Sequence, residues 1–103
     1  NLDANKGESD VSLKVNGTVA GITDTDIDNT KHTISLAHGA SIGVTNFIVA
    51  DTTNNVQAVN AISVKVIRDG KVVTSGNLAN GDIVRVVAEN GDVVEYTVTI
   101  ADK

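Results

Sequence analysis

The chain has 103 residues, which suits one domain with a single hydrophobic core. It contains no cysteine, so disulfide bonds and thiolate metal sites are excluded. Its formal net charge is −5 and its only aromatic residues are Phe47 and Tyr96, which disfavours binding to a phosphate backbone or to stacked bases. No apolar run approaches the roughly 20 residues that span a bilayer, so direct membrane insertion is not expected.

Alternation of apolar and polar residues at period two recurs along the chain, as it does in half-buried β-strands. It predicts strands at residues 11–15, 18–22, 31–36, 61–67, 71–74, 82–88 and 93–100. A mixed apolar run at residues 42–50 is expected to form another strand. Residues 1–10 are polar and are interpreted as a linker or first edge strand, and residues 11–103 as a single β-sandwich domain.

Glycines that follow Asn or Asp separate several of these stretches. Gly17, Gly70, Gly81 and Gly91 are expected to have positive φ angles, and Asn16-Gly17 and Asp69-Gly70 are typical of tight hairpins. Turn signals about every 8–12 residues are characteristic of a β-sandwich or barrel. We therefore predict an all-β fold, a two-sheet antiparallel β-sandwich of seven to eight short strands.

The same alternation indicates which side chains should face the core. Side chains expected to share an inner face are Ile62, Val64 and Val66 in one strand, and Val94, Tyr96, Val98 and Ile100 in the last. A buried tyrosine usually has a hydrogen-bond partner for its hydroxyl group, so one is expected for Tyr96.

An acidic loop offers the one candidate metal site. Asp24, Asp26 and Asp28 stand at alternate positions, and carboxylates spaced in this way can converge on a hard cation such as calcium. The EF-hand pattern is not met, because Asn29 and Ser35 occupy the positions of its glycine and its last glutamate. Two interpretations stay open: a solvated acidic loop, and a calcium site completed by oxygens from a neighbouring module.

Catalysis is not expected from this sequence. His32 and His38 are the only histidines and have no further ligands at zinc-site spacing. No nucleophile elbow is present, and no glycine-rich phosphate loop precedes a helix. Beyond calcium, no cofactor is predicted.

Two stretches resemble a known family. Residues 9–21, with Asn16-Gly17, resemble the opening of cadherin-like or immunoglobulin-like (Ig-like) β-sandwich repeats in bacterial secreted and surface-layer (S-layer-type) proteins. Residues 81–91 and the ending Glu95-Tyr-Thr-Val-Thr-Ile100 resemble the closing hairpin of those repeats. The resemblance implies an Ig-like fold; unlike many such repeats, this chain has no proline in its loops.

The function that the resemblance implies is structural. It is that of an extracellular tandem spacer or assembly module of a bacterial cell-surface protein, with neighbouring modules of the same protein or lattice as partners. The alternative is an adhesin or carbohydrate-binding module that uses loops at one end of the sandwich to bind a cell-surface glycan. A third candidate, an accessory domain of an enzyme, fits the same fold.

Overall fold

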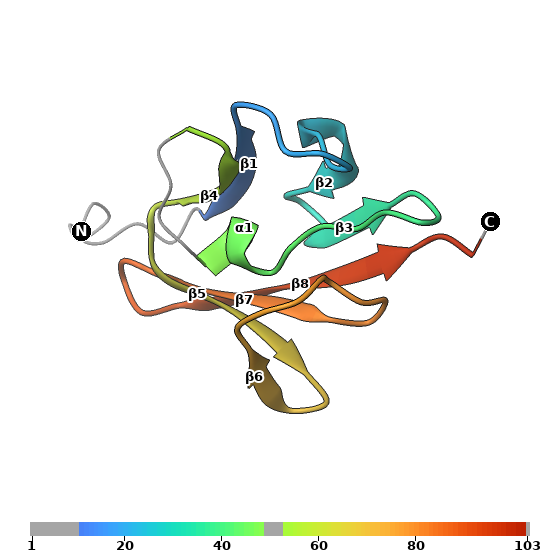
Figure 1. Cartoon of the computed structure of the whole chain (residues 1–103). Helices are drawn as coiled ribbons and strands as arrows, with labels where there is room; N and C mark the ends of the chain where they lie inside the picture. Colours follow the sequence, from blue (N-terminus) through green and yellow to red (C-terminus); the bar gives the residue numbers. More distant parts are fainter. Residues whose placement is uncertain (1–10, 49–52, 103) are drawn as a thin grey trace.

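The computed structural model describes residues 11–48 and 53–102 of the chain (Figure 1). Residues 1–10, and with them the predicted linker, lie outside the described residues, as do residues 49–52 and 103. The strands are β1 (Ser12–Asn16), β2 (Ile27–Asp28), β3 (Thr33–Leu36), β4 (Asn55–Val59), β5 (Ala61–Arg68), β6 (Lys71–Val73), β7 (Ile83–Ala88) and β8 (Val93–Ile100). A 3-10 turn, η2 (Asp24–Asp26), and one helical turn, α1 (Thr45–Ile48), interrupt them. Within the described part of the chain, neither is long enough to cross a membrane.

The strands form two sheets, which confirms the predicted all-β sandwich. Six strands pair in the order β2-β3-β8-β7-β5-β6, and β1 pairs with β4 in a second, smaller sheet. The prediction of antiparallel pairing throughout is wrong at one place, because β3 and β8 run parallel. Parallel neighbours need a long connection, and here most of the domain lies between the two strands.

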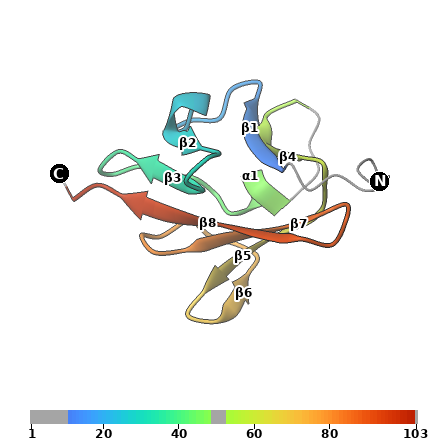
Figure 2. The same ribbon diagram turned by 180° about the vertical axis from the view of Figure 1, so that it is seen from behind.

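The core fills the space between the two sheets, with α1 between the layers (Figures 1 and 2). The inner face of β8 follows the predicted alternation: Tyr96 and Val98 are buried, whereas Glu95, Thr97 and Thr99 are exposed. Tyr96 is 0% exposed and donates a hydrogen bond from its hydroxyl group, as expected. All core side chains belong to one cluster, so the described residues share one hydrophobic core.

The predicted hairpin at Asn16-Gly17 is wrong, because β1 pairs with β4 and not with residues 18–22. Gly17 does have a positive φ of 72°, yet its role is a close approach between segments. A Cβ atom there would collide with the carbonyl oxygen of Thr53, and the neighbouring Thr18 amide donates to Asn54 Oδ1 at 2.9 Å. Residues 18–22 form a turn with an isolated bridge between Val19 and Ile22 instead of a strand.

The strand predicted at residues 42–50 is also wrong over the part that the structure describes. The Val44 amide donates to the Gly76 carbonyl at 2.8 Å, after which the chain makes the single helical turn α1. This turn brings Phe47 into the core, where it is 4% exposed. Burial of the large ring outweighs the strand preference of its neighbours.

In β5 a bulge changes the predicted faces. Ala61 lies opposite Ala88 and Ser63 opposite Val87, so Ile62 is an extra residue without a partner in β7. Ile62 is 68% exposed, whereas Val66 is fully buried as predicted. The expectation that Ile62 faces the core is therefore wrong.

The turns predicted at the glycines in the second half of the chain are confirmed. Asp69-Gly70 joins β5 to β6, and both residues have positive φ angles, of 53° and 77°. Gly81 and Gly91 also have the expected positive φ, of 92° and 94°. In the β7–β8 connection the Gly91 amide donates to the Ala88 carbonyl at 2.9 Å.

Replacement of Gly91 by valine should destabilise the domain by about 1–3 kcal/mol through backbone strain alone. A Cβ atom added there would meet no atom of another segment within 4 Å, so the expected cost comes from the backbone conformation. The measurement is chemical denaturation, with Glu89→Val as the control because Glu89 is exposed in the same connection. Equal stability of the two variants would show that the positive φ is not required.

Candidate functional site

The outer edge of β1 is covered by side chains from the acidic loop. Asn29 accepts a hydrogen bond from the Leu13 amide through Oδ1 at 2.9 Å and donates from Nδ2 to the Leu13 carbonyl at 3.1 Å. Asp24 Oδ1 accepts from the Val15 amide at 2.7 Å. The two side chains thus take the place of a neighbouring strand along this edge.

The other two carboxylates of the loop also accept backbone hydrogen bonds. Asp26 Oδ2 accepts from the Thr23 amide at 2.9 Å in a capping box at η2. Asp28 Oδ1 accepts from the Lys31 amide at 2.8 Å and the Thr30 amide at 2.9 Å. These two amides lower the pKa of Asp28 from its ordinary value. Each of the three aspartates therefore stabilises a different piece of backbone.

The described residues contain no group of three or more acidic, histidine or cysteine side chains that could hold a metal ion. Asp24, Asp26 and Asp28 are thus not brought together on one point in this structure. Calcium binding at these residues stays a prediction from the sequence.

If the calcium prediction holds for the isolated domain, millimolar calcium should raise its melting temperature relative to chelator, because a ligand of the native state stabilises it. Asp26→Asn should remove that increase, and Glu89→Gln should not, since Glu89 lies outside the loop. Identical melting curves in calcium and in chelator would contradict a site made by this domain alone.

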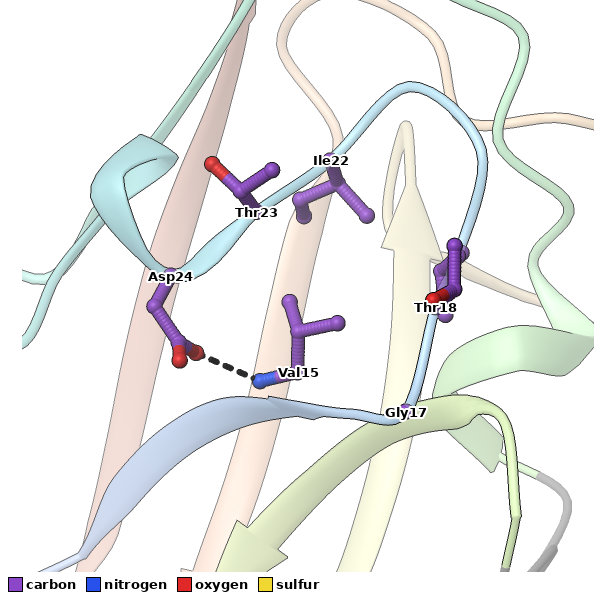
Figure 3. Close-up of a pocket in the computed structure, with 7 residues that line it drawn as sticks. Val15, Gly17, Thr18, Ile22, Thr23 and Asp24 are labelled. Carbon is purple, nitrogen blue, oxygen red and sulfur yellow. Dashed lines mark hydrogen bonds between the residues drawn. The ribbon is translucent and has the colours of Figure 1, made fainter.

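A small hollow lies beside this loop (Figure 3). It has a volume of about 210 Å³ and is lined by Val15, Gly17, Thr18, Val19, Ile22, Thr23 and Asp24. Typical ligand pockets measure roughly 300–1,000 Å³ and bury most of their ligand. The lining has no aromatic ring to pack on a sugar face, and its one carboxylate already accepts from Val15 (Figure 3).

The sequence does not predict an ion pair between the half-exposed Arg68 and the buried Asp82. Arg68 donates from Nε to Asp82 Oδ1 and from Nη2 to Asp82 Oδ2, each at 2.8 Å, and the Asp82 side chain is 1% exposed. Burial alone would raise the pKa of Asp82, but hydrogen bonds from Arg68 and the Ala79 amide outweigh it and hold that pKa below its ordinary value. The pair joins the end of β5 to the start of β7.

The two histidines lie in separate places and have structural contacts. The ring of His32 packs edge-on against Tyr96, with centroids 5.3 Å apart. Nδ1 of His38 lies 3.1 Å from the Ala101 carbonyl oxygen, within hydrogen-bond distance.

Comparisons with other proteins yield no match: no protein-family model, curated protein or solved structure is significantly similar to this chain. Fold and geometry alone define its class, which is that of an all-β sandwich domain.

Proposed function

We propose that this domain is a non-catalytic structural module of a bacterial cell-surface protein, an extracellular spacer joined in tandem to neighbouring modules in an S-layer-like array. The observation that carries the proposal is the position of β8. This last strand lies inside the six-stranded sheet, between antiparallel β7 and parallel β3. A strand with neighbours on both sides resists extraction better than an edge strand.

The parallel β3–β8 pair suits a domain that carries load. In Figure 1 the described chain begins near β1 on one side and ends beyond β8 on the other. A pull on both ends would draw β3 and β8 in opposite directions along their length. The hydrogen bonds between them would then be loaded together in shear, not broken one after another.

Further hydrogen bonds hold the end of β8. The Ala101 amide donates to the Leu36 carbonyl at 3.0 Å, and the Ile100 amide donates to Asn80 Oδ1 at 2.8 Å. The bond from Ala101 extends the β3–β8 attachment past the last residue of the strand. The end of β8 is thereby hydrogen-bonded both to the end of β3 and to Asn80.

The alternative, an adhesin or carbohydrate-binding module, would need a site at the loops. The hollow beside Asp24 is the candidate, but it is small and has no aromatic lining. The polar side chains of the acidic loop also accept bonds from backbone amides of this domain. These features favour the spacer.

The spacer proposal predicts where the domain is mechanically strong. With the chain pulled from its two ends, Ala101→Pro should raise the unfolding rate at constant force, because it removes the bond from the Ala101 amide to Leu36. Glu89→Pro is the matched control: it removes one backbone bond, to the Asn60 carbonyl, at another exposed strand end. Single-molecule force spectroscopy measures both rates.

Equal effects of the two substitutions under force, at equal loss of equilibrium stability, would contradict the proposal that the β3–β8 attachment carries the force. A glycan array or protein screen tests the alternative directly. A specific ligand of micromolar affinity, lost on substitution of Thr18 or Thr23, would make this a binding module.

A further inference from the structure

Within the described part of the chain, one side of β5 has no neighbouring strand over most of its length. β7 pairs along the other side, but β6 pairs only with Val66, Ile67 and Arg68. Among residues 11–48 and 53–102, no second strand pairs with Ala61–Lys65. We call this side of Ala61–Lys65 the open edge. Such an edge presents backbone N–H and C=O groups that can accept an added strand.

Another strand edge of the domain, the outer edge of β1, is covered by side chains. The outer edge of β1 is covered by Asn29 and Asp24, whose side chains hydrogen-bond its backbone. Beside the open edge, α1 lies between the two layers (Figures 1 and 2). It therefore packs on the inner face of the sheet and does not extend it.

Charges on the outer face of the sheet form an incomplete row that ends at the open edge. Lys65 lies directly opposite Arg85, and like charges in such positions destabilise a sheet. Arg85 in turn lies opposite Glu95 and donates to its carboxylate at 2.8 Å. The row thus reads positive, positive, negative, and an acidic side chain beside Lys65 would balance it.

The next row on the same face is apolar. The bulge exposes Ile62, next to the Ser63–Val87 pair, and Val87 lies opposite Val93. Ile62 and Val93 are 68% and 57% exposed, which makes them two of the most exposed large apolar side chains described. An apolar side chain from an added strand would cover Ile62.

We propose that the open edge binds an extended peptide segment of another protein, added antiparallel to β5 in line with β6. The segment would contain an acidic residue, then any residue, then an apolar residue. The acidic residue would lie beside Lys65, and the apolar residue, two positions later, would lie beside Ser63 and Ile62. This binding function is separate from the spacer role and does not depend on it.

A second copy of the chain fits the open edge less well. Antiparallel pairing of two copies about Ser63 would place each Ile62 opposite the Val64 of the other copy. The bulge puts Ile62 on the outer face, whereas Val64 follows the inner face with Val66. Each Lys65 would then lie opposite an alanine and gain no acidic partner.

The test is a titration of the isotope-labelled full chain with a short Thr-Glu-Thr-Val-Thr peptide, followed by NMR. We expect amide shifts concentrated at Ile62–Lys65. Lys65→Glu should weaken binding at least about fivefold and reverse the preference toward a Thr-Lys-Thr-Val-Thr peptide, because it exchanges an attractive cross-strand pair for a repulsive one. Lys14→Glu is the matched control, since Lys14 is exposed on β1 in the other sheet.

A peptide methylated on its backbone nitrogens should not bind, because strand addition depends on those N–H groups. The proposal is overturned if millimolar peptide leaves Ile62–Lys65 unshifted, or if Lys65→Glu and Lys14→Glu have equal effects. Shifts at the open edge that appear without peptide and disappear on dilution would show that a second copy is the occupant, which also overturns it.

Discussion

Arg68→Met is expected to lower the free energy of unfolding at neutral pH by more than the loss of an exposed ion pair does, that is by more than about 1 kcal/mol. The cost arises mainly from Asp82, whose side chain is 1% exposed and would keep a charge without its cation. Arg68 is itself 38% exposed, so the desolvation of the guanidinium contributes little and the effect depends on the buried carboxylate. Methionine retains the aliphatic part of the contact. Urea denaturation measures the difference.

The control is Arg85→Met, which removes the exposed partner of Glu95. Both side chains of that pair are about half-exposed, at 44% and 45%, and such pairs contribute at most about 1 kcal/mol. Similar losses of stability in the two variants would contradict a larger contribution of the Arg68–Asp82 pair.

The pH dependence of the Arg68→Met variant provides a second readout. The pKa of Asp82 is lowered in the folded protein, so this group stabilises the fold above its unfolded pKa of about 3.9 and loses that contribution as pH falls through the folded value. Without Arg68 only the Ala79 amide still opposes the effect of burial, so the pKa of Asp82 should lie higher than in the unchanged protein, and protonation of Asp82 should cost the folded state less. The stability difference between the two proteins should therefore shrink between neutral pH and pH of about 3.

The sequence predicts the closing β7–β8 hairpin well because the signals there are local. β7 and β8 alternate regularly, are adjacent in the chain and are joined by a short connection with glycine at a positive φ. Their faces and the burial of Tyr96 follow from period two alone. No distant segment has to be known.

The failures are at places where a distant segment decides the conformation. Gly17 resembles a hairpin residue, but it is required because Thr53 approaches it from β4's side. Residues 42–48 have strand-like composition. The hydrogen bond from the Val44 amide to Gly76 and the burial of Phe47 nevertheless produce an isolated β-bridge followed by a helical turn. Neither partner is visible from local periodicity.

The candidate site was predictable only in part. The spacing of Asp24, Asp26 and Asp28 shows that carboxylates gather in one loop, but not which amide each of them reaches. The available signal was the tendency of Asp and Asn to hydrogen-bond nearby backbone, which favoured a structural use. The sequence marks Asn29 only as a departure from the EF-hand pattern, although this residue links β1 to Tyr96.

Tyr96→Ala is expected to lower the free energy of unfolding by about 3–5 kcal/mol, as large truncations in a core do. Tyr96 is fully buried on the inner face of β8, and its ring contacts His32 edge-on. Thr97→Ala is the control because Thr97 is exposed on the same strand, and it should cost less than about 1 kcal/mol. A loss below about 1 kcal/mol for Tyr96→Ala would mean that the ring does not support the core.

The hydroxyl group of Tyr96 can be tested separately from its ring. It donates to Asn29 Oδ1 at 2.6 Å, and the same oxygen accepts from the Leu13 amide at 2.9 Å. Tyr96→Phe should therefore cost only about 1 kcal/mol, because Asn29 keeps one donor. Burial raises the pKa of Tyr96, so its hydroxyl group stays protonated as the donor at neutral pH.

Asn29→Ala should cost more than Tyr96→Phe, because it removes both bonds to Leu13 and leaves the buried hydroxyl group without its acceptor. A double-mutant cycle between Tyr96→Phe and Asn29→Ala measures the coupling, which we expect to be at least about 0.5 kcal/mol. Additive losses would show that the hydroxyl bond contributes nothing of its own. Coupling of the expected size would mean that one amide side chain joins the central strand of the large sheet to the edge of the small one.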